Sequence, residues 1–180
     1  MEDFGDHNDT RYREGIYVGY RYFDSAGKKA LYPFGHGLSY TTFAIDGITA
    51  SVHKDQITAG ATVTNTGTYA GKEVVQIYVS CPEGKLDKPY QDLVGFAKTS
   101  SLAPGESETV EISFSMKDLA SYDEKCAAWI LEKGNYVIRV GNSSVDTKIA
   151  ALAVLENTVT VRQAKNTCGR PDFTDWKPSF

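Results

Sequence analysis

Short apolar segments with a period of two, separated by turn residues about every 8 to 15 positions, most restrict how this chain can fold. In the segment 72–80, Val75, Ile77 and Val79 share one face and are expected to point into the core. Further strands are expected at 42–52, with a break at Gly47, and at 56–65, 93–98, 109–115, 129–132, 136–141 and 147–154. The pattern predicts an all-β, immunoglobulin-like sandwich of about seven strands.

Helical periodicity is weak along the whole chain. The one helical candidate is Ser115–Tyr122, where Ser115 has the side chain of an N-cap and one or two turns are expected. A last strand is expected at 158–162, before a polar tail that contains proline and glycine.

The segment before the sandwich also alternates. Ile16, Val18 and Tyr20 share one face and Tyr17 lies on the other, which predicts a strand or an extended segment covered by protein on both faces. About 40 residues cannot enclose a core of their own. We therefore expect this extended N-terminal appendage to fold back on the sandwich, to be covered by a second chain or to be partly disordered.

A shaped bend is expected at Leu31–Tyr40. Pro33 fixes φ, and Gly35 and Gly37 accept positive φ. Several large apolar side chains lie among these residues, although loops usually run over the surface. The bend is therefore expected to pack between two bodies.

Two stretches, Tyr12–Asp24 and Tyr32–Thr41, resemble the end of the second catalytic domain of glycoside hydrolase family 3 enzymes, the β-glucosidases and their relatives. Motifs of the following region are similar to the fibronectin type III-like domain of that family. They are Asn65-Thr-Gly67, the run 70–78, Leu93-Val-Gly-Phe96, Leu102-Ala-Pro-Gly105 and Gly134-Asn-Tyr136. The resemblance covers roughly residues 12 to 156.

The resemblance implies three parts. Residues 1–40 would be a remnant of the preceding α/β catalytic domain with its connection, 41–156 the sandwich, and 157–180 a linker or tail. Family members in permuted order have the barrel after the sandwich, and the tail fits either order. The parent enzyme would be a retaining β-glucosidase that hydrolyses terminal β-D-glucosyl residues, and its catalytic domains would be the partners of this chain.

Retaining glycosidases need two carboxyl groups about 5 to 5.5 Å apart. The family's nucleophilic aspartate lies in a motif similar to Thr174-Asp-Trp176, but the run before Asp175 is too polar for a barrel strand. The family's acid/base glutamate lies upstream of residues 12–24, so Glu14 does not inherit that role. We expect no catalytic, cofactor-binding or metal-binding residues in this chain.

The remaining candidates have structural interpretations. His36 is expected to pack at a domain junction rather than reach an active site, and Arg13 and Arg21 are expected to pair with carboxylates there. Trp129 is expected to be buried between the sheets. Tyr90 lies in the loop 86–92. Two roles are open for it, namely a contact with a sugar or a contact with the catalytic domains. Solvated strand or turn charges are expected at Glu106, Glu108, Asp118, Asp123 and Glu124.

Composition excludes some partners. The net charge is −4, from 19 Lys+Arg and 23 Asp+Glu, so no electrostatic footprint for nucleic acid is present. No apolar run approaches the roughly 20 residues that cross a bilayer, so no membrane partner is expected. Three dispersed cysteines and three dispersed histidines indicate neither a disulfide framework nor a zinc site. Unpaired cysteines slightly favour the cytoplasm.

Three functions compete. The favoured one is a non-catalytic structural and interdomain module of a family 3 enzyme. The alternative is a carbohydrate-binding module for polymeric glucan, which needs a flat exposed row of aromatic side chains, with Tyr69, Tyr78 and Tyr90 as candidates. A self-contained hydrolase is disfavoured because the carboxylate pair is missing.

Overall fold

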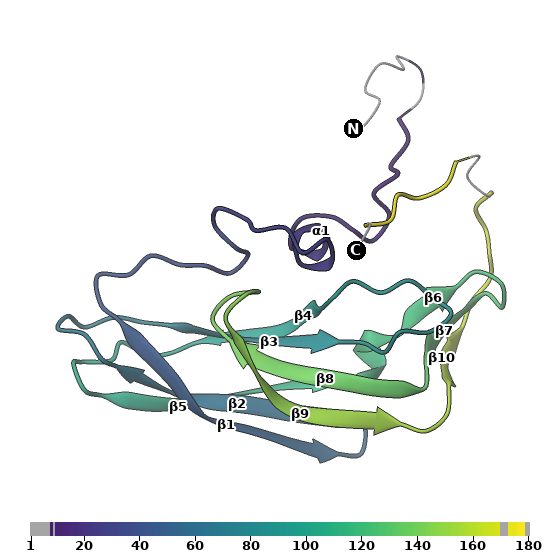
Figure 1. Ribbon diagram of the computed structural model, residues 1–180. Helices are drawn as coiled ribbons and strands as arrows, with labels where there is room; N and C mark the ends of the chain where they lie inside the picture. Colours follow the sequence, from purple (N-terminus) through teal and green to yellow (C-terminus); the bar gives the residue numbers. More distant parts are fainter. Residues whose placement is uncertain (1–7, 9, 170–172, 179–180) are drawn as a thin grey trace.

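The computed structural model describes residues 8, 10–169 and 173–178, and its main body is a sandwich of two antiparallel sheets. One sheet has the order β1-β2-β5 and the other the order β4-β3-β8-β9 (Figure 1). The strands of the first sheet are β1 (Phe43–His53), β2 (Gln56–Asn65) and β5 (Ser107–Ser115). Those of the second are β3 (Val74–Ser80), β4 (Asp92–Lys98), β8 (Gly134–Gly141) and β9 (Thr147–Leu155). The predicted sandwich fold is confirmed.

The core lies between the two sheets and is built by alternating residues. Val75, Ile77 and Val79 of β3 are fully buried, as predicted. They pack in one cluster with side chains from the facing sheet, namely Ile57, Val63, Val110, Ile112 and Phe114. At about 25 cal/mol per Å² of apolar surface removed from water, this cluster is the main stabilising term of the fold.

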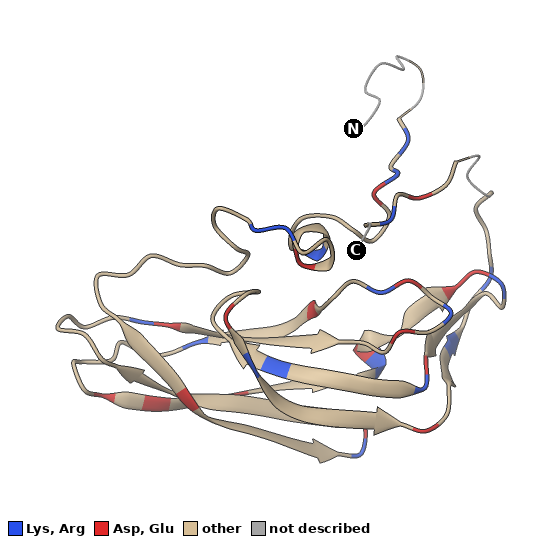
Figure 2. Cartoon of the chain, in the orientation of Figure 1, with Lys and Arg blue, Asp and Glu red and all other residues tan. Residues whose placement is uncertain are grey.

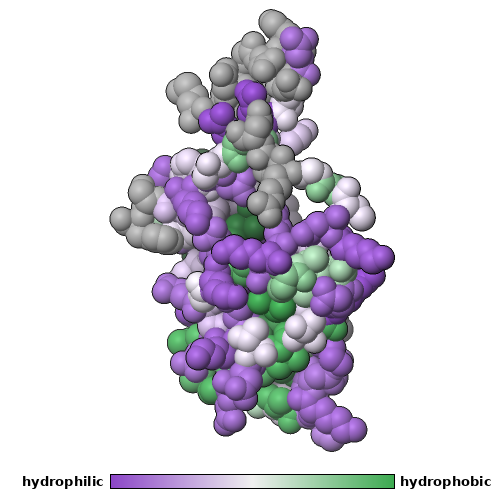
Figure 3. Space-filling view, turned by 90° about the vertical axis from the view of Figure 1, so that its right-hand side faces the viewer, coloured by the Kyte–Doolittle hydropathy of each residue, from purple (hydrophilic) through white to green (hydrophobic). Residues whose placement is uncertain are grey.

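A third, small sheet covers one end of the sandwich. Its order is β10-β7-β6, with β6 at Ser121–Asp123, β7 at Ala128–Leu131 and β10 at Val159–Gln163. The expected last strand at 158–162 is therefore confirmed as β10. Figure 3 looks at this end and shows a hydrophobic patch bordered by hydrophilic side chains.

Two local predictions have different outcomes. The short helical turn is confirmed as the 3-10 helix η1 (Met116–Leu119), with Ser115 as N-cap of a capping box that includes Asp118. The predicted break at Gly47 is wrong, because β1 continues through it. The strand accommodates Gly47, at φ 56°, by a register shift between Asp46 and Thr49.

The prediction of a strand or an extended segment over residues 16–23 is also wrong. The chain turns at Gly19, with φ 60°, and forms the short helix α1 (Tyr20–Ser25). Helix α1 lies above the β4-β3-β8 face of the sandwich (Figure 1). Within the described residues, no helix is long and apolar enough to cross a membrane.

Candidate interdomain surface

The appendage folds back on the outer face of the second sheet. This is one of the three arrangements expected from the sequence. Alternation turns Gln76 and Tyr78 of β3 away from the core, yet they are only 4% and 0% exposed. Tyr20 of α1 covers Tyr78 edge-on, with ring centroids 6.1 Å apart, and stacks on Phe34 at 4.5 Å. The central strand is therefore buried on both faces by one chain.

Gln76 anchors the bend of residues 31–40. Its Nε2 donates to the carbonyl oxygens of Gly35 at 3.2 Å and Asn142 at 2.5 Å, and its Oε1 accepts from the Tyr78 hydroxyl at 2.6 Å. Gly35 has φ 80°, and a Cβ there would lie 2.1 Å from Gln76 Oε1. This position requires glycine, both for its backbone conformation and for the close approach.

Helix α1 is attached to β4 and to the loop before it. Arg21 Nε pairs with Asp92 at 2.5 Å, so the expected carboxylate partner of Arg21 is confirmed. The Tyr20 hydroxyl accepts from the Leu93 N–H at 2.9 Å, and Ser25 Oγ accepts from the Tyr90 N–H at 2.9 Å. Three side chains of one turn thus fix its position on the sandwich.

A small polar cluster lies beneath α1. Gln91 is fully buried, and its Nε2 donates to Asp24 Oδ2 at 3.0 Å and to the Ser144 carbonyl at 2.5 Å. Burial raises the pKa of Asp24, against the lowering effect of its hydrogen bonds from Gln91 and Ser144. Gln91 Oε1 has no partner among the described residues.

The bend itself projects outward from these anchors. Leu31, Leu38 and Tyr40 are 89%, 90% and 97% exposed, and Tyr32 is 69% exposed. We call these four residues the 31–40 surface. The bend is attached to the sandwich on one side through the carbonyls of Phe34 and Gly35, which accept from the Ser144 N–H and from Gln76. Its other side is exposed as far as the described residues go. An exposed apolar cluster of this kind usually marks an interaction site.

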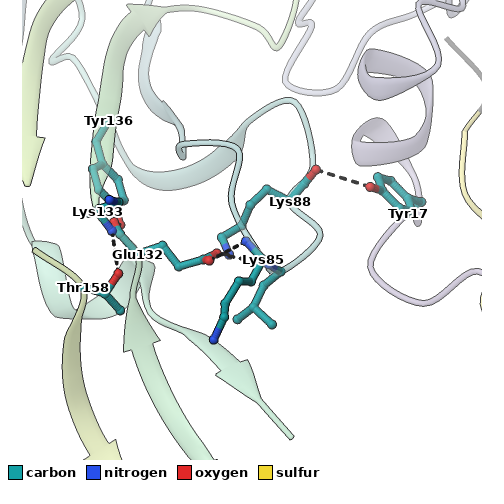
Figure 4. A network of polar contacts seen from close by, with 8 residues as sticks. Tyr17, Lys85, Lys88, Glu132, Lys133, Tyr136 and Thr158 are labelled. Atoms are coloured by element: carbon teal, nitrogen blue, oxygen red, sulfur yellow. Dashed lines mark hydrogen bonds and ion pairs between the residues drawn. The ribbon is translucent and has the colours of Figure 1, made fainter. Parts of the chain in front are cut away.

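A buried ion pair holds the loop between β3 and β4. Glu132 accepts from the backbone N–H groups of Lys85 at 2.7 Å and Leu86 at 3.3 Å, and from Lys88 Nζ at 2.9 Å (Figure 4). Burial alone would raise the pKa of Glu132, but these donors outweigh burial and lower it. The Tyr17 hydroxyl reaches the Lys88 carbonyl at 3.4 Å, which ties the appendage to the same loop.

The tail returns to the appendage. The ring of Trp176 lies 4.9 Å from that of Tyr22 and meets Tyr17 edge-on at 6.4 Å. The backbone N–H of Trp176 donates to the carbonyl of Arg13 at 2.6 Å. Both ends of the described chain therefore meet on the same side of the sandwich (Figure 1).

One sequence interpretation needs correction, and two others stay predictions. Trp129 is 42% exposed rather than buried between the sheets, because Ala128 and Ile130, its neighbours on β7, take the inward positions. His36 is exposed in this chain, with its ring stacked on that of Tyr32 at 5.9 Å, and Arg13 is exposed as well. Their contacts at a junction with a neighbouring domain stay predictions.

The proposed aromatic row does not form. Tyr78 is fully buried, while Tyr69 and Tyr90 are exposed. The Arg139 guanidinium lies 5.4 Å from the centroid of the Tyr90 ring. A flat platform of Tyr69, Tyr78 and Tyr90 for a polysaccharide is therefore excluded.

Among the carboxylates, Glu106, Asp118 and Glu124 are exposed, as expected. Asp123 is buried instead, and its Oδ1 accepts from the Lys125 N–H at 2.9 Å. Basic and acidic residues are interspersed over the strands (Figure 2).

The cysteines are free thiols. Cys126 and Cys168 are exposed, whereas burial, and secondarily the charge of Asp92, raise the pKa of the Cys81 thiol to about 12. No group of three or more His, Cys, Asp or Glu side chains in the described ranges is arranged to hold a metal ion.

Comparisons with known proteins identify the domain. Residues 73–144 match the family described as fibronectin type III-like domain. The chain is 45% identical to β-glucosidase A of Butyrivibrio fibrisolvens, over 92% of this chain and 24% of that protein. It is 41% identical to an exo-α-(1→6)-L-arabinopyranosidase of Bifidobacterium breve, over 84% of this chain and 20% of that protein.

Comparison with solved structures leads to the same group of enzymes as comparison of sequences. β-Glucosidase 3B of Thermotoga neapolitana, in complex with glucose, superposes with a TM-score of 0.82 and 39% identity, over 89% of this chain and 23% of that one. The family 3 β-glucosidase of Bifidobacterium adolescentis gives a TM-score of 0.74 and 37% identity, over 96% and 24% of the two chains. The present chain spans about a quarter or less of each of these proteins.

The fold and the match thus define a fibronectin type III-like β-sandwich domain. More particularly, the chain belongs to glycoside hydrolase family 3 and corresponds to the fibronectin type III-like part of its β-glucosidases. The relatives are multidomain enzymes in which this region is one part.

Proposed function

We propose that this chain is a non-catalytic interdomain module that holds the catalytic domains of a family 3 enzyme in their working arrangement. The whole enzyme would be a retaining glycosidase of the β-glucosidase type, acting on terminal β-D-glucosyl residues. In this proposal the catalytic domains supply both carboxyl groups of the reaction, and the module supplies none.

One observation carries the proposal. Leu31, Leu38 and Tyr40 are at least 89% exposed, within a bend that Gln76 fixes to the sandwich. Burying such side chains is favourable by roughly 1.5 to 3 kcal/mol each. A chain that presents them on a fixed support is suited to dock against another body.

Several contacts hold the appendage, which carries the 31–40 surface, in a fixed position on the sandwich. A hydrogen bond from Gln76, an ion pair from Arg21 and the edge-on contact of Tyr20 with Tyr78 attach the appendage to β3 and β4. A misplacement of about 1 Å in an active site can cost on the order of a hundredfold in rate. A docked sandwich limits such displacements between the domains that it contacts.

Substrate choice would lie outside this module. Relatives with this region include both β-glucosidases and an exo-α-(1→6)-L-arabinopyranosidase. The same sandwich therefore accompanies different sugar specificities, as expected when the site lies on other domains.

Association of separately produced parts tests the proposal. The catalytic domains of the parent enzyme and the 180-residue chain are mixed, and binding is measured by calorimetry. We expect binding that Leu38→Asp weakens by at least tenfold, because it places an unpaired charge in a packed interface. Val52→Asp, on β1 and also exposed, is the matched control. No association, or equal weakening by both changes, contradicts the proposal.

A further inference from the structure

A groove of about 890 Å³ runs between the β3–β4 loop and the end of the sandwich that carries β6 and β7. Leu86 and Pro89 lie on its loop side, and Tyr122 and Trp129 lie on its sheet side. A volume of this size falls in the range of small-molecule sites, about 300 to 1,000 Å³. The groove is distinct from the 31–40 surface, none of whose residues line it.

Two aromatic rings form a platform in the groove. Trp129 of β7 is the direct antiparallel partner of Tyr122 of β6, so their side chains project from the same face. Their ring centroids are 5.5 Å apart with the planes tilted by 54°. Trp129 is 42% exposed, and the alternation along β7 keeps it turned to solvent.

The platform is held in place before any ligand arrives. The Tyr122 hydroxyl donates to Asn166 Oδ1 at 2.5 Å, and Asn166 Nδ2 donates to the Glu124 carbonyl at 2.8 Å. On the opposite wall, the buried Lys88–Glu132 pair fixes the loop. Preorganised walls reduce the entropy lost on binding.

The polar lining of the groove is mostly acidic. It contains the carboxylates of Asp87, Asp92, Asp118, Asp123, Glu124 and Asp175. The cations in the lining are Arg21, Lys88 and Lys125, of which Arg21 pairs with Asp92 and Lys88 pairs with Glu132. Asp87 is paired with Lys177, so the acidic groups left for a ligand are Asp118, Asp123, Glu124 and Asp175. A groove of this charge disfavours anionic ligands such as nucleotides or uronic acid polymers, whereas carboxylates accept strong hydrogen bonds from hydroxyl groups.

We propose that this groove binds a neutral oligosaccharide, with one pyranose ring stacked on Trp129 and its hydroxyls donating to the flanking carboxylates. The C–H face of a pyranose carries partial positive charge, which suits the negative face of an indole ring. This site is separate from the 31–40 surface, but the choice of a glucan as its ligand rests on the proposed function as part of a glycosidase.

Nuclear magnetic resonance of the 180-residue chain tests the proposal. The sequence has 2 tryptophans, so the indole N–H signals of Trp129 and Trp176 are assigned by comparison with Trp129→Phe. Cellopentaose and laminaripentaose are added to millimolar concentration. We expect the Trp129 signal to move saturably with at least one of them, and to move further than the Trp176 signal, because only Trp129 lines the groove.

Variants supply the controls. Trp129→Ala should weaken binding roughly tenfold, while Trp129→Phe retains part of it. Tyr69→Ala, at an exposed ring outside the groove, should change nothing. No movement of the Trp129 signal with either sugar overturns the proposal. Movement with oligolysine but with neither sugar also overturns it and identifies a site for basic protein segments.

Discussion

Lys88 Nζ lies 2.9 Å from Glu132 Oε2, and the two side chains are only 8% and 6% exposed. This pair connects the β3–β4 loop with the end of β7. The loop forms one wall of the groove and also receives α1, through the bond between the Tyr90 N–H and Ser25 Oγ. Removal of one partner should therefore affect both the sandwich and the appendage.

Glu132→Gln should destabilise the chain by about 3 to 5 kcal/mol, because it leaves the Lys88 ammonium buried without a counter-charge. Urea denaturation gives the free energy of unfolding. Asp46→Asn, at the exposed pair with Lys148, serves as control and should cause a far smaller loss. Equal effects of the two substitutions would show that the buried pair has no special role.

The same residue predicts a pH dependence. The pKa of Glu132 is lowered in the folded chain, so its stabilising contribution is fully present above the ordinary glutamate value of about 4.3. The contribution is lost as the pH falls through that value and through the lowered folded value. The stability difference between wild type and Glu132→Gln should thus shrink below about pH 4.3. A difference that stays constant down to pH 3 would argue against the ionised pair.

Gly35→Ala should release the bend from the sandwich. The new Cβ would meet Gln76 Oε1 at 2.1 Å and adopt φ 80°, a conformation that costs about 1 to 2 kcal/mol for L-residues. Hydrogen exchange of the Ser144 N–H, which donates to the Phe34 carbonyl at 2.9 Å, should become faster. Gly37→Ala is the control, since its Cβ would meet nothing within 4 Å and its φ is not positive. Unchanged protection in Gly35→Ala would mean that Gly35 does not fix the bend.

The strands of the sandwich could be predicted because their signals are local. Val110, Ile112 and Phe114 alternate with polar residues, and all three are buried in the core. The fully buried Tyr78 shows where this reasoning fails. The alternation along β3 correctly places Tyr78 on the outer face of its sheet. The alternation cannot show that Tyr20 and the bend cover this outer face.

Helix α1 and Trp129 were predicted wrongly for different reasons. The residues of α1 alternate like a strand, but Gly19 at φ 60° turns the chain, and Arg21 and Tyr20 bind β4. Tertiary contacts thus override a weak local preference. For Trp129, the general preference of tryptophan for protein cores conflicts with the period of two of β7. The structure follows the period, with Ala128 and Ile130 buried and Trp129 facing outward.

Part of the candidate surface could be predicted as well. The apolar residues of the bend were evident in the sequence, and the bend was expected to pack between two bodies. The sandwich is one of them, since Gln76 and the Ser144 N–H donate to the carbonyls of Gly35 and Phe34. The second body stays a prediction. The groove was not predicted, because its walls come from segments far apart in the sequence, such as Leu86 and Trp129.

The most direct test of the interdomain role compares thermal unfolding of the 180-residue chain with that of the same chain joined to its catalytic domains. Both carry the double substitution Leu31→Asp/Leu38→Asp, at side chains that are 89% and 90% exposed here. We predict an unchanged midpoint for the chain alone and a loss of several kcal/mol for the joined protein, because the new charges are buried only there. An unchanged midpoint in both proteins would contradict the account.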